Sequence, residues 1–451
     1  MRAWRERADA WLFAALLIVG AACIALLSAR YSIIADWSAG ARASLAPESR
    51  AILAQLPGPV HATSYARPTG DLRAQIAAFI ARYQRYKPDL KLTFVDPDAD
   101  PALMRKQAIS VDGEIVLRWH DREQRIDQLD ERSFNDALAR LTRSRDRLIA
   151  FVTGDGERNA NGKANADLGE FIAQLSTRGI RALPMNLAQS AGVPRNADLV
   201  VLASPQAELA PTAVQALRDW LDHGGNLLWL TEPDTGEVGL TPLAQMLGMR
   251  VLPGTLVDGT GAAFGLGDPR LIVETVYPPQ AITHGFKLNT LYPQVAALAV
   301  VSGAEWASVP ILSSGAQSWN QIAPVDPAQA STIKYDASLG ELRGPLDFGL
   351  ALTRLSPSPD KNEQRAVVIG DGDFLSNSFL GNGGNRALGE RVVDWLLNDD
   401  ALVGLPPRGA PDRALKLTQL DLDGITWGFL IALPLLLLAT GIAITWRRRR
   451  R

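Results

Sequence analysis

Two long apolar runs without a charged side chain lie near the two ends of the chain, at residues 11–27 and 425–446. A helix needs roughly 20 apolar residues to cross the hydrocarbon core of a bilayer, where it satisfies its own backbone polar groups. The second run meets this length, and the first is near its lower limit. The sequence therefore predicts two single transmembrane helices with the bulk of the chain between them.

The arginines around these runs predict the orientation. Three arginines lie within residues 1–7, and residues 447–451 are all arginine. Cytoplasmic flanks of membrane helices are enriched in Lys and Arg. We therefore expect a bacterial inner-membrane protein in contact with lipid, with both termini cytoplasmic and residues of about 30–424 periplasmic. The alternative for the first run is a signal peptide cleaved near residues 41–43, but that site lies well downstream of the run.

The composition excludes several classes of function. The 46 Lys and Arg residues nearly balance the 48 Asp and Glu residues, so no basic surplus points to nucleic acid. Cys23, the single cysteine, lies inside the first apolar run. The chain has no G-x-x-x-x-G-K-[ST] phosphate loop, no G-x-S-x-G turn and no C-x-x-C pair, and its four histidines lack metal-ligand spacing. We expect no cofactor and no metal.

The first part of the region between the runs has the pattern of a small α/β domain. Helix and strand patterns alternate there in the order βαβ(α)ββα, which is that of a thioredoxin-like domain. A further helix, at residues 45–56, precedes this order. The strands are expected at residues 59–65, 90–95, 115–119 and 124–126, and the main helices at residues 71–86 and 133–141.

From residue 147 the pattern becomes that of a doubly wound parallel sheet, flavodoxin-like in type. Buried-type strands are expected at residues 148–153, 180–185, 199–203, 226–230 and 365–369, with helices at 167–178, 211–222 and 386–398. Residues of about 250–345 are rich in Gly and Pro and are expected to form a β-rich insertion or a lobe of antiparallel strands.

Together these patterns predict an α/β protein with a defined domain order. The expected parts are a cytoplasmic N-terminus with the first membrane helix (1–30), a thioredoxin-like periplasmic domain (31–146), an α/β periplasmic domain (147–404), a linker (405–424), the second membrane helix (425–446) and a cytoplasmic basic tail (447–451).

Polar clusters follow four of the predicted strands directly. In a parallel sheet the carboxyl ends of the strands share one edge, where open α/β folds bind ligands. We therefore expect a ligand pocket at this edge. The alternative is that these residues only turn the chain and cap the helices that follow. The candidate ligand-binding residues are Asp155, Glu157, Arg158, Ser204, Glu232, Asp371 and Asp373.

Two short acidic patterns are too incomplete to identify a catalytic or metal site. Asp371 and Asp373 have the D-x-D spacing of aspartate phosphotransferases, but those enzymes place Thr or Val where this chain has Leu375. Residues 96–100 begin like a calcium loop, yet the Gly at position six is missing and Gln107 stands where the loop needs Glu.

Four stretches together resemble the auxiliary components of gliding-motility-type ABC transporters. The resemblance covers nearly the whole chain, including both terminal runs. The matching stretches are residues 36–38 with 45–49 (DWS and LAPES, for D-W-T and L-S-P-x-T), 94–98 (FVDPD, for V-D-P-D), 151–157 (FVTGDGE, for F-x-T-G-H-G-E) and 367–377 (VVIGDGDFLSN, for G-D-S-D-F-x-x-N).

The resemblance implies a fold and partners. Family members accompany an ABC ATPase and a membrane permease, and their outer region combines a thioredoxin-like domain with a glutamine-amidotransferase-like domain that lacks the catalytic cysteine. It also adds Asn377 to the candidate ligand-binding residues. Asp155 departs from the family, which often has His there, and this puts catalytic use of that loop in doubt.

The leading hypothesis is therefore a non-enzymatic accessory subunit of an ABC transporter that binds a periplasmic ligand or partner. One alternative is a membrane-anchored hydrolase using carboxylates such as Glu157 and Asp373, which would need paired carboxyls with one raised pKa. Another is a structural scaffold of an envelope machine, which would need an apolar outer patch.

Overall fold

The computed structural model describes most of the region between the two apolar runs. The described residues are 44–403, apart from 100–103, 105–106, 108, 110, 144, 191, 234–237, 260–263, 325–332 and 360–361, together with 17, 19–20, 426–427, 431 and 433–449. Residues up to Pro407 form one compact unit and Arg408–Arg451 a second.

The N-terminal part of the first unit is built on a four-stranded sheet in the order β2-β1-β3-β4. β1 and β2 are parallel, and β3 runs antiparallel to β1 and to β4. The predicted order of strands and main helices is present, whereas the helix expected between β2 and β3 falls on residues most of which lie outside the described part of the chain. The elements are α2 (Pro47–Ala54), β1 (Val60–Tyr65), α3 (Leu72–Gln84), β2 (Leu90–Val95), β3 (Glu114–Trp119), β4 (Arg122–Ile126) and α5 (Glu131–Thr142).

Local chemistry explains the ends of two of these elements. β3 and β4 form a hairpin whose turn contains His120 at φ 51°, in the left-handed region that tight two-residue turns use. α5 begins where the Asp130 carboxylate accepts a hydrogen bond from the main-chain N–H of Ser133 at 2.9 Å, a standard N-cap. Phe79, Tyr83 and Phe134 pack together under the sheet, with ring centroids 4.4–5.4 Å apart.

The second part of this unit is a nine-stranded sheet in the order β6-β5-β7-β8-β17-β16-β13-β9, with β14 paired to β16. The strands from β6 to β17 are parallel, and the strands beyond them are antiparallel. Their bounds are β5 (Arg147–Val152), β6 (Ile180–Met185), β7 (Leu199–Ala203), β8 (Asn226–Leu230), β9 (Met249–Val251), β13 (Leu298–Val300), β14 (Ala307–Ser313), β16 (Asp347–Leu355) and β17 (Glu363–Ile369).

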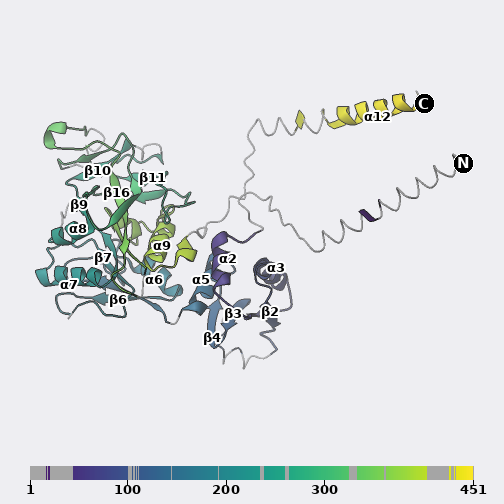
Figure 1. Ribbon diagram of the computed structural model, residues 1–451, viewed down its shortest axis with the longest axis horizontal. Helices are drawn as coiled ribbons and strands as arrows, with labels where there is room; N and C mark the ends of the chain where they lie inside the picture. Colours follow the sequence, from purple (N-terminus) through teal and green to yellow (C-terminus); the bar gives the residue numbers. More distant parts are fainter. Residues whose placement is uncertain are drawn as a thin grey trace. The chain divides into compact units, whose positions relative to one another are not determined.

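Helices cover both faces of this sheet, as Figure 1 shows. α6 (Gly169–Thr177) and α9 (Asn385–Leu396) pack on one face, and α7 (Pro211–Asp222) and α8 (Thr241–Leu247) on the other. Alternate residues of β8 enter the two cores: Leu228 and Leu230 face α6 and α9, whereas Trp229 faces α7 and α8. A strand buried on both faces explains the continuous apolar sequence NLLWL.

The structure has antiparallel strands in residues of about 250–345, the range expected to form a β-rich insertion or a lobe of antiparallel strands. β9, β13 and β14 pair, directly or through one another, with β16 and extend the main sheet. β16 makes this possible because its central residues are buried and it pairs with β17 as a long hairpin. Two small two-stranded sheets remain outside it, formed by β10 (Thr255–Val257) with β15 (Trp319–Gln321) and β11 (Ile272–Glu274) with β12 (Thr290–Tyr292).

Buried charges join α5 to the helices of the larger sheet. Arg132 of α5 binds Glu390 and Asp394 of α9, each at 3.1 Å. Asp136 of α5 binds Arg178, which follows α6, at 2.9 Å, and Arg178 also reaches Asp394 at 2.7 Å. All five side chains are at most 8% exposed. We call these residues the junction network.

A short helix at the end of the first unit also connects the two sheets. α10 (Asp400–Val403) follows α9 closely and contacts α2. Its Leu402 is 1% exposed and belongs to the hydrophobic core of the four-stranded sheet. The core of the first sheet is therefore completed by residues that lie about 270 positions beyond its last strand.

The second unit contains α12 (Leu433–Arg449). No helix in the described residues is both long enough and apolar enough for a membrane crossing. Most of the first apolar run and all of the 405–424 linker lie outside the described residues. The two transmembrane helices stay a prediction.

Candidate functional site

Neighbouring parallel strands bring polar loops together at one edge of the larger sheet. β5, β7, β8 and β17 are adjacent in that order, and each ends in one of the polar clusters. Arg158 comes from the loop after β5, and Ser204 follows β7 directly. Glu232 lies just beyond β8, and Asp371 just beyond β17. Together with Asp373, at the start of a short 3-10 helix, these residues form what we call the strand-end cluster.

Arg158 is the centre of the strand-end cluster. Its Nη2 binds Glu232 Oε1 at 2.7 Å, and its Nη1 binds Asp373 Oδ1 at 2.8 Å. Its Nε donates a hydrogen bond to Ser204 Oγ at 3.1 Å. The Arg158 and Glu232 side chains are each only 10% exposed, so solvent screens this ion pair weakly. The planar guanidinium thus holds three loops in one arrangement.

Glu232 is held by several donors at once. Ser204 Oγ donates to its Oε1 at 2.6 Å, and the main-chain N–H of Gly372 donates to the same oxygen at 3.2 Å. Burial raises the pKa of the Glu232 carboxyl, although Arg158 and Ser204 oppose this. Glycine at position 372 allows this close approach, because a Cβ there would lie 2.0 Å from Ser204 Oγ and would displace that hydroxyl.

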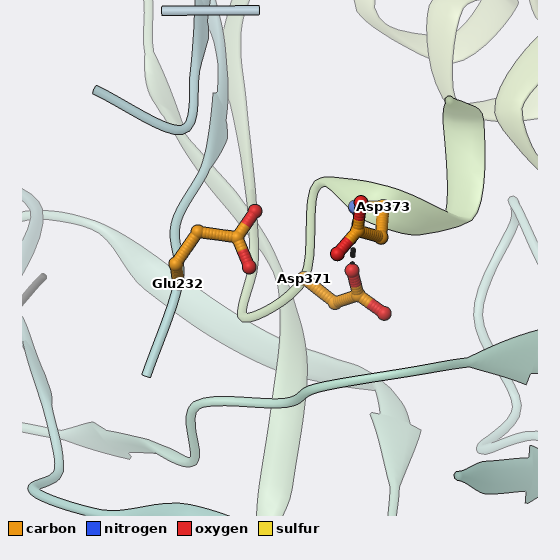
Figure 2. A group of neighbouring side chains, drawn as sticks. All are labelled: Glu232, Asp371 and Asp373. Carbon is orange, nitrogen blue, oxygen red and sulfur yellow. Dashed lines mark hydrogen bonds between the residues drawn. The ribbon is translucent and has the colours of Figure 1, made fainter. Parts of the chain in front are cut away.

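Asp371 is the most deeply buried member, with no exposed surface. Its Oδ1 accepts a hydrogen bond from the main-chain N–H of Asp373 at 2.6 Å, and its buried Oδ2 has no hydrogen-bond partner among the described residues. Figure 2 shows the Glu232, Asp371 and Asp373 carboxyl groups gathered together. Burial, and then the negative charges of Glu232 and Asp373, raise the pKa of Asp371 well above its usual value.

Three carboxyl groups therefore share one guanidinium. One oxygen from each of Glu232, Asp371 and Asp373 lies within 4.8 Å of the others, so the group could hold a cation. Arg158 forms ion pairs with two of these carboxylates, Glu232 and Asp373, but its single positive charge offsets only one of the three. A proton on Asp371 would remove a second negative charge without a metal. The absence of a metal, expected from the sequence, stays a prediction.

Three other candidate residues have different local roles. Glu157 Oε2 accepts a hydrogen bond from the main-chain N–H of Asp155 at 2.8 Å, which shapes the loop after β5. The Asp155 carbonyl accepts hydrogen bonds from the N–H groups of residues 206 and 207, both at 2.9 Å. Asn377 Oδ1 accepts from the N–H of Glu170 at 2.9 Å, at the start of α6. These contacts are those of turns and helix ends.

The three carboxyl groups that lie together do not include both members of the pair suggested for a hydrolase, Glu157 and Asp373. Asp373 belongs to the group of three, but its neighbours are Glu232 and Asp371, and Glu157 is not part of this group. Gly372 is not among the candidate residues predicted from the sequence. The G-D-G-D pattern nevertheless contains a usable signal, because a glycine between two site carboxylates indicates close backbone approach.

Comparisons with known proteins add the following. No match was found among curated proteins. Among solved structures, the mmIFT52 N-terminal domain has a TM-score of 0.41 and 17% identity, covering 55% of this chain and 97% of its own. A ThuA-like protein from Bacteroides uniformis has a TM-score of 0.28 and 11% identity (58% and 93% covered), and a Fasciola hepatica thioredoxin 0.17 and 14% (20% and 88% covered). Likenesses this partial support no inference.

The family comparison is more extensive. A model of the family described as an ABC-type uncharacterized transport system matches residues 146–399, which is more than half of the chain and includes every member of the strand-end cluster. The matched range runs from the residue before β5 to just beyond α9, so it coincides with the larger sheet and its helices. The chain therefore belongs to this family of ABC-type transport system proteins.

Proposed function

We propose that this protein is a membrane-anchored, non-enzymatic accessory subunit of a bacterial ABC transporter, with its bulk in the periplasm. Family membership over residues 146–399 carries the proposal, because it supports an accessory role in an ABC-type transport system. The two uncharged apolar runs supply the anchors, and the arginines outside them set the orientation. The permease and ATPase subunits are the proposed partners.

The proposal assigns different roles to the two sheets. The order of the four-stranded sheet supports a thioredoxin-like domain, which without cysteine would serve as a structural or docking module. The larger sheet, with helices on both faces, supports an amidotransferase-like domain. Its strand-end cluster lies where open α/β sheets bind ligands, and we propose it as the contact point for a periplasmic ligand or partner.

One observation favours an enzyme as the second candidate. Glu232 and Asp371 are neighbouring buried carboxyls with raised pKa values, and such pairs serve acid–base catalysis in hydrolases. The accessory role is preferred because Arg158 forms ion pairs with both Glu232 and Asp373, so these two carboxylates are already engaged within the protein.

Co-purification from the native host tests the accessory role. The tagged full-length chain is extracted in mild detergent, and its companions are identified by mass spectrometry. We expect an ABC permease and ATPase in constant ratio to the chain. The control is the same chain ending at Pro407, which lacks the second apolar run. Recovery of the full-length chain alone, under conditions that keep other ABC complexes intact, would contradict the proposal.

The single cysteine allows a clean test of topology. In a Cys23→Ser background, one new cysteine is introduced as Asp121→Cys, in the β3–β4 turn, or as Arg451→Cys, at the C-terminus. A membrane-impermeant maleimide is added to intact spheroplasts. We expect labelling at position 121 at once and at position 451 only after lysis. The reverse pattern would overturn the proposed orientation.

A further inference from the structure

A polar cavity of about 240 Å³ lies at the junction of the two sheets. Its walls come from β4, the end of α5, the residues before β5 and Gly179 after α6. None of them belongs to the strand-end cluster. The charged residues that line it are Arg122, Glu123, Arg140, Arg143, Arg145 and Asp146.

Two of the four arginines are already paired with carboxylates. Arg143 binds Asp399 at 2.6 Å, and Arg145 binds Asp198 at 2.7 Å. Within this cavity they contribute donors, but much of their charge is offset.

The other two arginines bind main-chain carbonyl groups instead. Arg122 Nη1 donates to the carbonyls of Leu141 and Arg143, at 2.9 and 2.6 Å. Arg140 Nη1 donates to the carbonyl of Thr177 at 2.6 Å. In the described part of the chain, neither guanidinium forms an ion pair. A guanidinium has five N–H donors, so both retain donors beyond these bonds.

The acids of the cavity do not balance these charges. Glu123 binds Arg118 Nε at 2.8 Å and lies 3.6 Å from Arg125, so its carboxylate is shared with arginines outside the cavity lining. Asp146 is the remaining acid of the lining. The cavity therefore carries a surplus of positive charge.

The environment of Arg140 agrees with this surplus. Burial lowers its pKa, and Arg143 and Arg178 lower it further, against the opposing effect of Asp136 and Asp146. Its Nε is buried and meets no acceptor among the described residues. An anion in the cavity would relieve this repulsion.

We propose that this cavity binds a phosphate-class oxyanion, either as inorganic phosphate or as the phosphoryl group of a larger ligand. Guanidinium forks match the geometry of phosphate oxygens and form charge-assisted hydrogen bonds with them. Arg122 and Arg140 approach from two different elements, β4 and α5. A tetrahedral anion can serve donors from several directions, whereas a planar carboxylate offers only two oxygens.

Binding there would also link the two sheets. Arg122 and Arg140 belong to the four-stranded sheet and its last helix, whereas Asp146 and Gly179 flank β5 and α6 of the larger sheet. An anion held between them would stabilise this junction. Because the anion would bind the form in which the two parts are joined and not the separated form, its concentration would set how firmly the two parts are held together.

The test measures thermal unfolding of the full-length chain in phosphate-free buffer, titrated with inorganic phosphate or with sn-glycerol 3-phosphate. Chloride and acetate at equal ionic strength serve as controls. We expect a saturable rise in the unfolding midpoint with at least one of the two phosphoryl probes. Inorganic phosphate alone would identify the free ion as the ligand, and glycerol phosphate alone a headgroup-type ligand. No saturable rise with either would overturn the proposal.

Variants distinguish this cavity from other anion contacts. Arg140→Gln should weaken the apparent affinity for the active probe at least tenfold. Arg67→Gln should leave it unchanged, because neither Arg67 nor its partners Asp98 and Asp112 line the cavity. Asp146→Asn removes the remaining acid and should tighten binding severalfold, an outcome that misfolding cannot imitate. Equal affinities in the wild type, Arg140→Gln and Asp146→Asn would show that the anion binds elsewhere and would refute the proposal.

Discussion

Charge balance around Arg158 determines the behaviour of individual residues at the strand ends. Arg158 is 10% exposed and pairs with both Glu232 and Asp373. Burial alone would lower its pKa, but the adjacent carboxylates raise it above the usual arginine value. Removal of one partner from a buried ion pair leaves an uncompensated charge, which is more destabilising than the pair is stabilising.

Arg158→Gln should therefore lower the free energy of unfolding by about 3 kcal/mol at pH 7.5. The loss should shrink toward pH 5, because the released carboxylates can then take up protons. Urea unfolding of the full-length chain at the two pH values measures this difference. Arg118→Gln, at a pair with 51% and 35% exposed side chains, is the matched control and should change stability by less than ~1 kcal/mol. Equal losses in the two variants would contradict this assignment.

Asp371→Asn should raise the free energy of unfolding, whereas Arg158→Gln lowers it. The raised pKa means that folded Asp371 binds a proton that the unfolded chain has already lost above about pH 4. Wild-type stability therefore falls as pH rises through the folded pKa, and Asn removes this fall. We expect the variant to gain about 1 kcal/mol or more relative to wild type between pH 5 and pH 8. Thermal unfolding in EDTA measures it.

The same variant distinguishes a proton from a cation at Asp371. If the group held a divalent ion, Mg²⁺ or Ca²⁺ would raise the unfolding midpoint of the wild type, and Asp371→Asn would abolish that rise. With a proton there, neither ion changes the midpoint of either protein. A Mg²⁺- or Ca²⁺-dependent rise would therefore overturn the metal-free expectation.

The sequence predicts which residues lie at the strand ends, but it does not predict which way their side chains point. Strand order places Arg158, Glu232 and Asp371 on one edge, because the carboxyl ends of parallel strands meet there. Asn377 lies in the same stretch, yet its side chain holds the start of α6. A loop side chain can point either way without a change in sequence pattern, so only the coordinates separate these roles.

Between elements, the junction network determines how α5 packs on α6 and α9. Two arginines face three carboxylates there. Burial raises the pKa of Asp394 to about 6, although Arg178 and Arg132 oppose it. For Asp136, the same arginines outweigh burial and hold the pKa below its usual value. Asp394 is therefore the surplus carboxylate, and Asp136 a fully paired one.

This imbalance predicts unequal effects of two substitutions. Arg178→Met leaves Asp136 and Asp394 without their shared cation and should destabilise the chain by about 3–5 kcal/mol. Asp394→Asn leaves one carboxylate for each arginine and should change stability at pH 8 by no more than ~1 kcal/mol. Below its folded pKa, Asp394 is already neutral, so the variant should also flatten the pH dependence between about 4 and 6. Denaturant unfolding across this pH range measures both effects. Equal losses of stability in the two variants would contradict the assignment of Asp394 as the surplus carboxylate.

Secondary structure was predictable from sequence only where the periodicity was long. Alternation and helical spacing identified the long strands and helices, such as α7 with its apolar stripe. Three-residue strands such as β9 and β13 give too few residues for a pattern. Their pairing depends on register with distant strands, which no local sequence encodes. The junction network was missed for the same reason, because isolated arginines and acids on helices read as solvent-facing.

At the scale of the whole molecule, the position of the C-terminal boundary of the first unit is testable. α10 completes the core of the four-stranded sheet through Leu402, and Asp399, just before it, pairs with Arg143 and Arg147. A chain that ends at Pro407 should keep the unfolding midpoint of the full-length protein. A chain that ends at Leu397 should lose several degrees, since it lacks a buried leucine and these ion pairs. Calorimetry of both truncations measures this; equal midpoints would show that α10 is dispensable.

The contact between α2 and α10 has a mechanical consequence. The first described helix and the last helix of this body touch, although more than 340 positions separate them. The start and the end of this body are therefore held together by this contact, and a force that separates them acts first on α2 and α10 rather than on the strands of either sheet.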